Sequence, residues 1–128
     1  MKVLSIKEPW ASLIINGYKE YEFRSWKTKY RGKILIHTSK GIDKKSIDRF
    51  KCYELEYKYG VIIGEAKLID CIKVDEKFRN NLINENSIVY SKSIYVEKYA
   101  WHLTNIKKYD KPIEISGHLG LWEYNKNI

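Results

Sequence analysis

The segment Gly17–Arg24 places three charged side chains where a helix is predicted to end and a strand to begin. Lys19, Glu22 and Arg24 follow Gly17 with the spacing G-x-K-x-x-E-x-R. Such charges add little to folding, because a surface ion pair is worth about 0–1 kcal/mol and a buried one often fails to repay its desolvation. We therefore interpret them as groups that hold a ligand. The alternative is an ion-pair network that locks the junction.

The three residue types suit a ligand that carries both phosphate and base edges. Arg24 can donate two hydrogen bonds to a phosphate or to a base acceptor edge. Glu22 can accept from an exocyclic amine or hold a neighbouring cation. Lys19 can neutralise phosphate, or, if it is desolvated beside Arg24, lose its proton more readily and act as a base or nucleophile.

Two tryptophans near these charges are candidate stacking platforms for a base, an interaction worth about 1–3 kcal/mol. Trp10 lies on the apolar face of a predicted helix, so core packing is its favoured role. Trp26 shares a strand face with Glu22 and Arg24, which favours a cleft or surface position. Trp101 and Trp122 stand in apolar strand contexts and are predicted to lie in the core.

A basic rim is predicted beside this cleft. Its alternative is an ordinary solvated face, which is the usual role of a run of charges. The rim consists of Lys27, Lys29, Arg31, Lys33 and Lys40.

The elements that position these groups follow from periodicity and from glycine and proline signals. Pro9 and Gly17 bound a first helix, and from Lys19 the apolar period changes from helical to alternating. Asp43 is a candidate N-cap for a second helix to about Tyr57. Strands are predicted at 2–6, 19–26, 33–38, 61–70, 99–103 and 117–122, with a turn at 111–112 and short helical turns or a mobile loop in 74–94.

About six strands and two main helices without βαβ alternation predict an α+β domain built round a small barrel. In the strongest strand, the small residues Gly64 and Ala66 share a face, so another backbone or a ligand can approach there. The 128 residues suit one domain spanning 1–128.

Composition limits the functional classes. A net charge of +8 favours a partner that bears phosphate, although a lysine-rich proteome would give the same balance. No apolar run is long enough for a membrane span, and no leader sequence is recognisable. Cys52 and Cys71 form no C-x-x-C pair, so we expect reduced thiols and a cytoplasmic location.

No cofactor or metal site is predicted. His37, His102 and His118 lack the spacing of metal ligands, and His37 either reaches the cleft or is a satisfied barrel histidine. The sequence contains no phosphate-binding loop and no dinucleotide fingerprint, and nothing in it supports a Ser-His-Asp arrangement.

Five sequence blocks, in this order, resemble the ASCH domain family of the PUA-like superfamily, over about residues 2–124 and most weakly in 74–94. The blocks are Leu4–Ala11, Gly17–Arg24, Tyr30–Gly32 with Ile36–His37, Ile63–Ala66 with Asp70–Cys71, and Gly117–Trp122.

The resemblance implies a small mixed β-barrel with flanking helices and a cleft between the barrel and the first helix, lined by Lys19, Glu22 and Arg24. It also implies RNA or a modified nucleoside as the partner. Some small bacterial relatives are amidohydrolases of N4-acetylcytidine that use a lysine and a threonine in this segment. Lys19 matches the lysine, whereas Glu22 stands in the place of the threonine.

Two main hypotheses follow. The first is an RNA- or modified-nucleoside-binding domain in RNA metabolism or its regulation, with Lys19, Glu22, Arg24, Trp26, Trp10 and Lys40 as binding residues. The second is a small hydrolase acting on an acylated base or on RNA, with Lys19 and either Glu22 or Glu65 as catalytic residues. A third possibility is an interaction domain with no nucleic-acid partner, whose cleft is closed by its own side chains.

Overall fold

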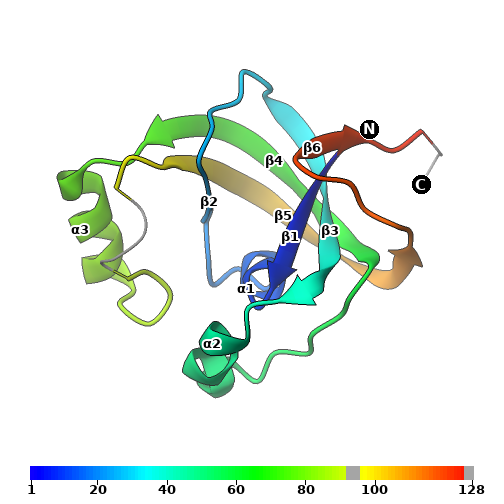
Figure 1. Ribbon diagram of the computed structural model, residues 1–128, viewed down its shortest axis with the longest axis horizontal. Coiled ribbons are helices and arrows are strands. Elements are labelled where there is room, and N and C mark those ends of the chain that lie inside the picture. The colour runs from blue at the N-terminus through cyan, green and yellow to red at the C-terminus, as the bar shows by residue number, and fades with distance from the viewer. Residues whose placement is uncertain (92–95, 126–128) are drawn as a thin grey trace.

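Six strands and three α-helices are present in residues 1–91 and 96–125, which the computed structural model describes (Figure 1). The strands are β1 (Lys2–Glu8), β2 (Tyr21–Arg24), β3 (Gly32–Ile42), β4 (Val61–Lys73), β5 (Tyr99–Glu114) and β6 (Leu121–Glu123). The helices are α1 (Trp10–Ile15), α2 (Lys44–Ile47), the 3₁₀ helix η1 (Asp48–Tyr53) and α3 (Glu76–Glu85).

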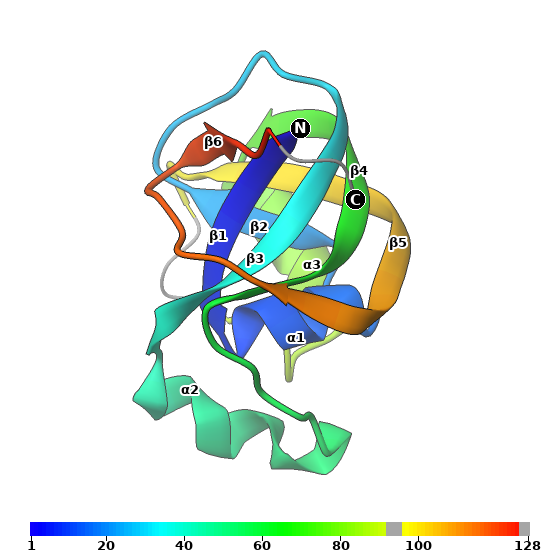
Figure 2. The same cartoon turned by 90° about the vertical axis from the view of Figure 1, so that its right-hand side faces the viewer.

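All six strands belong to one mixed sheet in the order β2-β5-β4-β3-β1-β6. Among the strand pairs of the described residues, the β1–β3 pair alone is parallel. The predicted α+β class is confirmed. The sheet curls strongly (Figure 2) but does not close into a barrel, because its order ends in two short edge strands, β2 with four residues and β6 with three.

The main core lies between the curled sheet and α1. Leu4 and Ile36 of the parallel pair, Ile14 of α1 and Trp101 of β5 are all buried in it. The predicted close approach at Gly64 is confirmed as a packing contact with backbone and helix. A β-carbon at this position would collide with the Lys107 carbonyl of β5 and with the Ile15 side chain of α1.

The predicted helix from Asp43 to about Tyr57 is broken into α2 and η1. Phe50 has φ −108° and ψ 15°, and Glu54 adopts the left-handed conformation at φ 51°. Phe50 is fully buried. The break therefore falls at the most deeply buried side chain of this segment.

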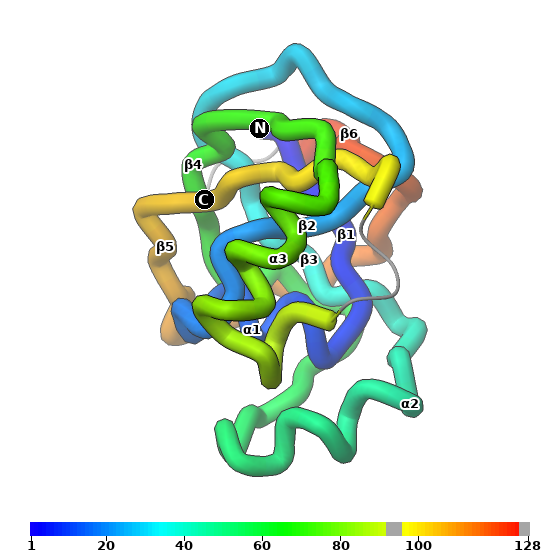
Figure 3. The backbone as a smooth tube through the Cα atoms, turned by 90° about the vertical axis from the view of Figure 1, so that its left-hand side faces the viewer, coloured from blue at the N-terminus to red at the C-terminus, as the bar shows by residue number. Residues whose placement is uncertain are grey.

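The C-terminal half differs from the prediction in three places. The predicted turn at 111–112 lies inside β5, which runs to Glu114, and β6 begins only at Leu121. Within 74–94 the structure contains α3, whose N-cap Asp75 accepts a hydrogen bond from Phe78 N at 2.8 Å. Figure 3 shows α3 beside β2. The Phe78 ring of α3 meets the Tyr21 ring of β2 edge-on, with the ring centres 5.3 Å apart. Residues 92–94 of the predicted loop lie outside the described residues.

Within the described residues, none of the helices has both the length and the apolar character that crossing a membrane would require.

Candidate ligand-binding cleft

An open cleft of about 870 Å³ lies on the side where the curled sheet is not closed. Its walls come from β1, β2, β3 and the loop that precedes β6. Four of the six predicted binding residues line it: Trp10, Glu22, Arg24 and Lys40. The other two, Lys19 and Trp26, lie beside it. A cleft of this size is in the usual range for small-molecule sites.

Lys19 lies behind the cleft wall, with only 3% of its surface exposed. Gly17, at φ +83°, ends α1, and the next turn places the Lys19 amide on the Leu13 carbonyl at 3.2 Å. The Lys19 Nζ donates to Glu22 Oε1 at 2.8 Å and stands 5.1 Å from the centre of the Phe23 ring. Burial lowers the pKa of Lys19 despite the attraction of Glu22.

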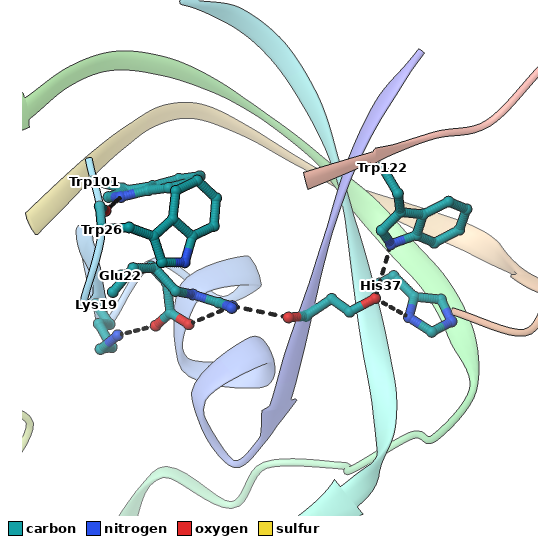
Figure 4. Close-up of polar contacts among 8 residues, drawn as sticks. Lys19, Glu22, Trp26, His37, Trp101 and Trp122 are labelled. Atoms are coloured by element: carbon teal, nitrogen blue, oxygen red, sulfur yellow. Dashed lines mark hydrogen bonds and ion pairs between the residues drawn. The ribbon is translucent and has the colours of Figure 1, made fainter. Parts of the chain in front are cut away.

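Glu22 shares its carboxylate between two cations and is 8% exposed. Oε1 accepts from Lys19, and Oε2 accepts from Arg24 Nη2 at 3.0 Å (Figure 4). Burial alone would raise the pKa of Glu22, but Lys19 and Arg24 together outweigh it and hold the pKa below its usual value. Glu22 therefore carries a negative charge at neutral pH.

Arg24 connects the two sides of the open sheet. Its Nη2 also donates to the Ser5 carbonyl of β1 at 2.8 Å, although β1 and β2 are not neighbours in the sheet. The guanidinium is thus fixed by one carboxylate and one backbone carbonyl at the wall of the cleft. A planar cation held this way is preorganised for a second, planar acceptor group.

Two buried polar atoms in the cleft walls have no hydrogen-bond partner among the described residues. They are Arg24 Nε and Ser39 Oγ. An unsatisfied buried polar group costs about 1–3 kcal/mol, so such groups are rare in proteins. Ser39 was not predicted. It follows the strand predicted at 33–38, and only the longer β3 brings it to the cleft.

The two predicted stacking residues have different surroundings. Trp10 lines the cleft with one part of its ring and packs against Phe50 with another, the ring centres lying 5.3 Å apart. Trp26 is 39% exposed and is held edge-on by Trp101 at 4.7 Å. Its ring lies next to Gly120, at the edge of the cleft.

Most of the predicted basic rim does not line the cleft; only Lys40 does. Lys33 lies 3.4 Å from Glu65, and Arg31 lies 3.9 Å from Asp70, so both pair with acidic residues of β4. The structure adds Lys7, which is exposed and lines the cleft. Side chains alternate between the two faces of a strand, so Ser5 and Lys7 of β1 lie on the same face. This alternation was the sequence signal that would have placed Lys7 at the cleft.

A second polar cluster in the wall joins β1, β3 and β6. His37 Nδ1 lies 2.9 Å from Ser5 Oγ, and His37 Nε2 lies 2.8 Å from the Ile115 carbonyl. Trp122 Nε1 donates to Ser5 Oγ at 3.0 Å (Figure 4). Both Ser5 and His37 line the cleft. The two alternatives predicted for His37 therefore both hold, because its ring reaches the cleft and has hydrogen-bond partners on both nitrogens.

This cluster was missed because its members are far apart in the sequence. Ser5 and His37 become direct partners only through the parallel register of β1 and β3. Burial lowers the pKa of His37, which is therefore neutral at pH 7. Glu65, the other acid considered for catalysis, accepts from the Tyr109 hydroxyl at 2.9 Å and does not line the cleft.

No group of three or more His, Cys, Asp or Glu side chains suited to a metal ion occurs within residues 1–91 and 96–125.

Comparison with known proteins identifies the family. The sequence matches the ASCH domain over residues 4–113. The chain belongs to the ASCH domain family. Its resemblance to human Activating signal cointegrator 1 amounts to 27% identity over 98% of the chain and 25% of that protein, and the mouse protein gives the same values. The chain thus spans about a quarter of the length of these relatives.

The fold is that of solved ASCH structures. The crystal structure of ASCH from Zymomonas mobilis superposes with a TM-score of 0.57 at 21% identity, covering 88% of this chain and 72% of that one. A mutant of the same protein gives a TM-score of 0.54, with 88% and 74% covered. At this identity the likeness concerns the fold alone.

Proposed function

We propose that this ASCH domain binds RNA or a modified nucleoside in the cleft between β1 and β2. The observation that carries the proposal is the lining of the cleft, in which three cationic side chains, Lys7, Arg24 and Lys40, stand beside the aromatic ring of Trp10. Two polar atoms in the wall, Arg24 Nε and Ser39 Oγ, are buried without a partner among the described residues, and a small movement of the wall would let a ligand bond to them.

The charge of the cleft favours an anionic ligand. Three cationic side chains line it, Lys7, Arg24 and Lys40, against one carboxylate, Glu22. Because Glu22 is already bonded to Lys19 and Arg24, the excess of two positive charges is available to phosphate. Clefts of one sign also concentrate ligands of the opposite sign.

Aromatic surface next to these cations favours a nucleotide over a simple anion. Trp10 lines the cleft itself, and Trp26 presents a rigid, half-exposed ring at its edge. In the proposed complex Arg24 binds a phosphate or a base edge, Lys40 and Lys7 bind phosphate, and a base stacks on Trp26 or Trp10.

The alternative hydrolase that uses Lys19 and Glu22 has less support. Lys19 does not line the cleft, and its Nζ is occupied by Glu22 beneath Trp10 and Phe23. A catalytic group must come within hydrogen-bond reach of the reacting atoms. We therefore assign Lys19 a positioning role through Glu22, and we place the domain in cytoplasmic RNA metabolism or its regulation.

The proposal is tested by titrating the protein with four ligands: a single-stranded RNA of about 12 nucleotides, the matching duplex, cytidine and N4-acetylcytidine. We expect saturable binding of the RNA or of one nucleoside, weakened in Lys40→Ala. The matched control is Lys51→Ala, which removes an exposed lysine of η1 that pairs with Asp48 and does not line the cleft. Absence of binding by all four ligands would refute the proposal.

A further inference from the structure

Ser5 and His37 have the geometry of a nucleophile and its base. The Ile115 carbonyl can only accept, so the proton on the His37 ring lies on Nε2, 2.8 Å from that oxygen. Nδ1 is then an acceptor, and the Ser5 hydroxyl donates to it across 2.9 Å. Ile115 thus fixes the tautomer that lets His37 take a proton from Ser5.

Two further contacts favour an ionised Ser5 oxygen. Trp122 Nε1 can only donate, and it points at Ser5 Oγ from 3.0 Å. The Arg24 guanidinium, bonded to the Ser5 carbonyl at 2.8 Å, adds a positive charge to the same strand. The Trp122 hydrogen bond becomes stronger when negative charge develops on Oγ, whereas Arg24 acts on Oγ only through its charge.

The loop before β6 reaches the pair at a position where only a glycine fits. Gly117 lies against the pair: a β-carbon there would stand 2.7 Å from His37 Nδ1 and 2.8 Å from Ser5 Oγ. Ser5, His37 and Gly117 all line the cleft.

We propose that Ser5 is a nucleophile, with His37 as its general base, and that the cleft hydrolyses carboxylic esters of anionic molecules. The anionic part of the substrate is held by Arg24 and Lys40. This activity does not depend on the ligand being a nucleic acid, so it stands or falls separately from the proposed binding function.

The reaction balances with water as the only co-reactant. Ser5 Oγ forms a bond to the ester carbonyl carbon while its proton passes to His37 Nδ1. The bond to the alkoxy group breaks, and that group leaves as the alcohol with the proton from His37. Water then attacks the acyl-serine, its proton passes to His37 and on to Ser5 Oγ, and the carboxylic acid is released.

The group that orients His37, the Ile115 carbonyl, favours esters over amides as substrates. A neutral carbonyl, Ile115, orients His37 where serine proteases use a carboxylate. The imidazolium is therefore less stabilised, and His37 is the weaker base. An alkoxide leaves more readily than an amide nitrogen, so an ester places a smaller demand on the base.

The direct test is labelling of the intact chain with a fluorophosphonate probe, followed by peptide mass spectrometry. We expect the adduct on Ser5, with labelling at least about 100-fold slower in His37→Phe. Ser116→Ala, which removes another hydroxyl of the cleft lining, is the matched control and should label normally. An unlabelled Ser5, or a label that spreads over other serines, would overturn the proposal without requiring any variant to fold.

Turnover supplies the second readout. We expect release of 4-nitrophenol from 4-nitrophenyl hydrogen succinate to exceed that from the acetate, and Ser5→Ala to abolish both. The excess should disappear in Lys40→Ala. Equal rates in wild type and Ser5→Ala would contradict the assignment. Labelling of Ser5 without RNA binding would refute the proposed function alone, and RNA binding without labelling would refute this inference alone.

Discussion

At the scale of single residues, the cleft depends on one buried carboxylate. Glu22 receives Lys19 from behind the wall and Arg24 from within it, at 2.8 and 3.0 Å. Breaking a buried ion pair by removing one partner leaves a charge without compensation, which costs more than the intact pair contributes. Lys19 is thus important for the shape of the site without being reachable by a ligand.

Replacing Lys19 by methionine should lower the free energy of unfolding by about 3 kcal/mol at neutral pH, because Glu22 loses one of its two cations. The pKa of Glu22 is held low in the folded protein, so its contribution to stability is complete above its unfolded value and lost as the pH falls. In Lys19→Met this loss should begin at a higher pH. Urea denaturation across the acidic range measures both effects.

The matched control is Lys51→Met, which breaks an exposed pair with Asp48 and should change the free energy of unfolding by less than about 0.5 kcal/mol. Equal effects of the two substitutions would show that Glu22 does not depend on Lys19.

Gly117→Ala should destabilise the protein by about 1–3 kcal/mol, because the new methyl group would overlap His37 and Ser5 Oγ. Gly41→Ala is the control, since its β-carbon would meet the Lys7 side chain at 3.5 Å from Cε and 3.9 Å from Cδ, both ordinary contacts. Thermal unfolding of both variants checks this. A Gly117→Ala protein as stable as Gly41→Ala would mean that the loop before β6 does not pack on the pair.

At the scale of elements, α1 is fixed by the acid that precedes it. The buried carboxylate of Glu8 accepts from the Ser12 amide at 2.7 Å and from the Lys58 amide at 3.1 Å. It therefore connects the start of the helix with the segment before β4. Burial raises the pKa of Glu8, and the hydrogen bonds from Ser12 and Lys58 offset this only in part.

The raised pKa sets the sign of a pH effect. The folded protein binds the Glu8 proton more tightly than the unfolded chain, so this contribution is complete below the ordinary value of 4.5 and is lost as the pH rises through the folded pKa. Glu8→Gln cannot ionise. Its free energy of unfolding, measured by urea titrations, should therefore improve relative to wild type as the pH rises above the ordinary value of 4.5. A constant difference, or one that widens against the variant, would contradict the burial argument.

The helices and strands were predictable where hydrophobic periodicity agrees with glycine and proline signals at the ends of an element. Examples are α1, which lies between Pro9 and Gly17, and the apolar run that forms β4. They were not predictable where tertiary contacts decide. The segment with Pro112 reads as a turn, yet the residues around it pair with β4, where Ile113 lies opposite Ile62. The helix predicted after Asp43 is interrupted at Phe50, whose ring is buried by contacts that are distant in sequence.

At the scale of the whole molecule, the open side of the sheet makes the site. Because β2 and β6 are edge strands, β1 and β2 face one another without a backbone ladder, and Arg24 spans the distance to Ser5. The charged motif predicted Glu22 and Arg24 as residues of the cleft. It could not predict Ser5, His37 and Ser39, because these reach the cleft through the β1–β3 register and the length of β3.

The charge of the cleft predicts how binding responds to salt. With three cations on single-stranded RNA, the logarithm of the association constant should fall with the logarithm of salt concentration at a slope of about −2. Lys40→Ala should reduce the magnitude of the slope by about 0.7, whereas Lys51→Ala should leave it unchanged. Fluorescence titrations at several salt concentrations give the slopes, and a common slope for all three proteins would place the phosphates elsewhere.

The most direct measurement is the dissociation constant of the RNA, or of whichever nucleoside binds best, for wild type and Arg24→Lys. The substitution keeps the positive charge but removes the planar fork and the unpartnered Nε. If the ligand binds in this cleft by contacting the Arg24 guanidinium, its affinity for the variant should fall at least about tenfold, or 1.4 kcal/mol. Unchanged affinity in a folded Arg24→Lys protein would contradict the account.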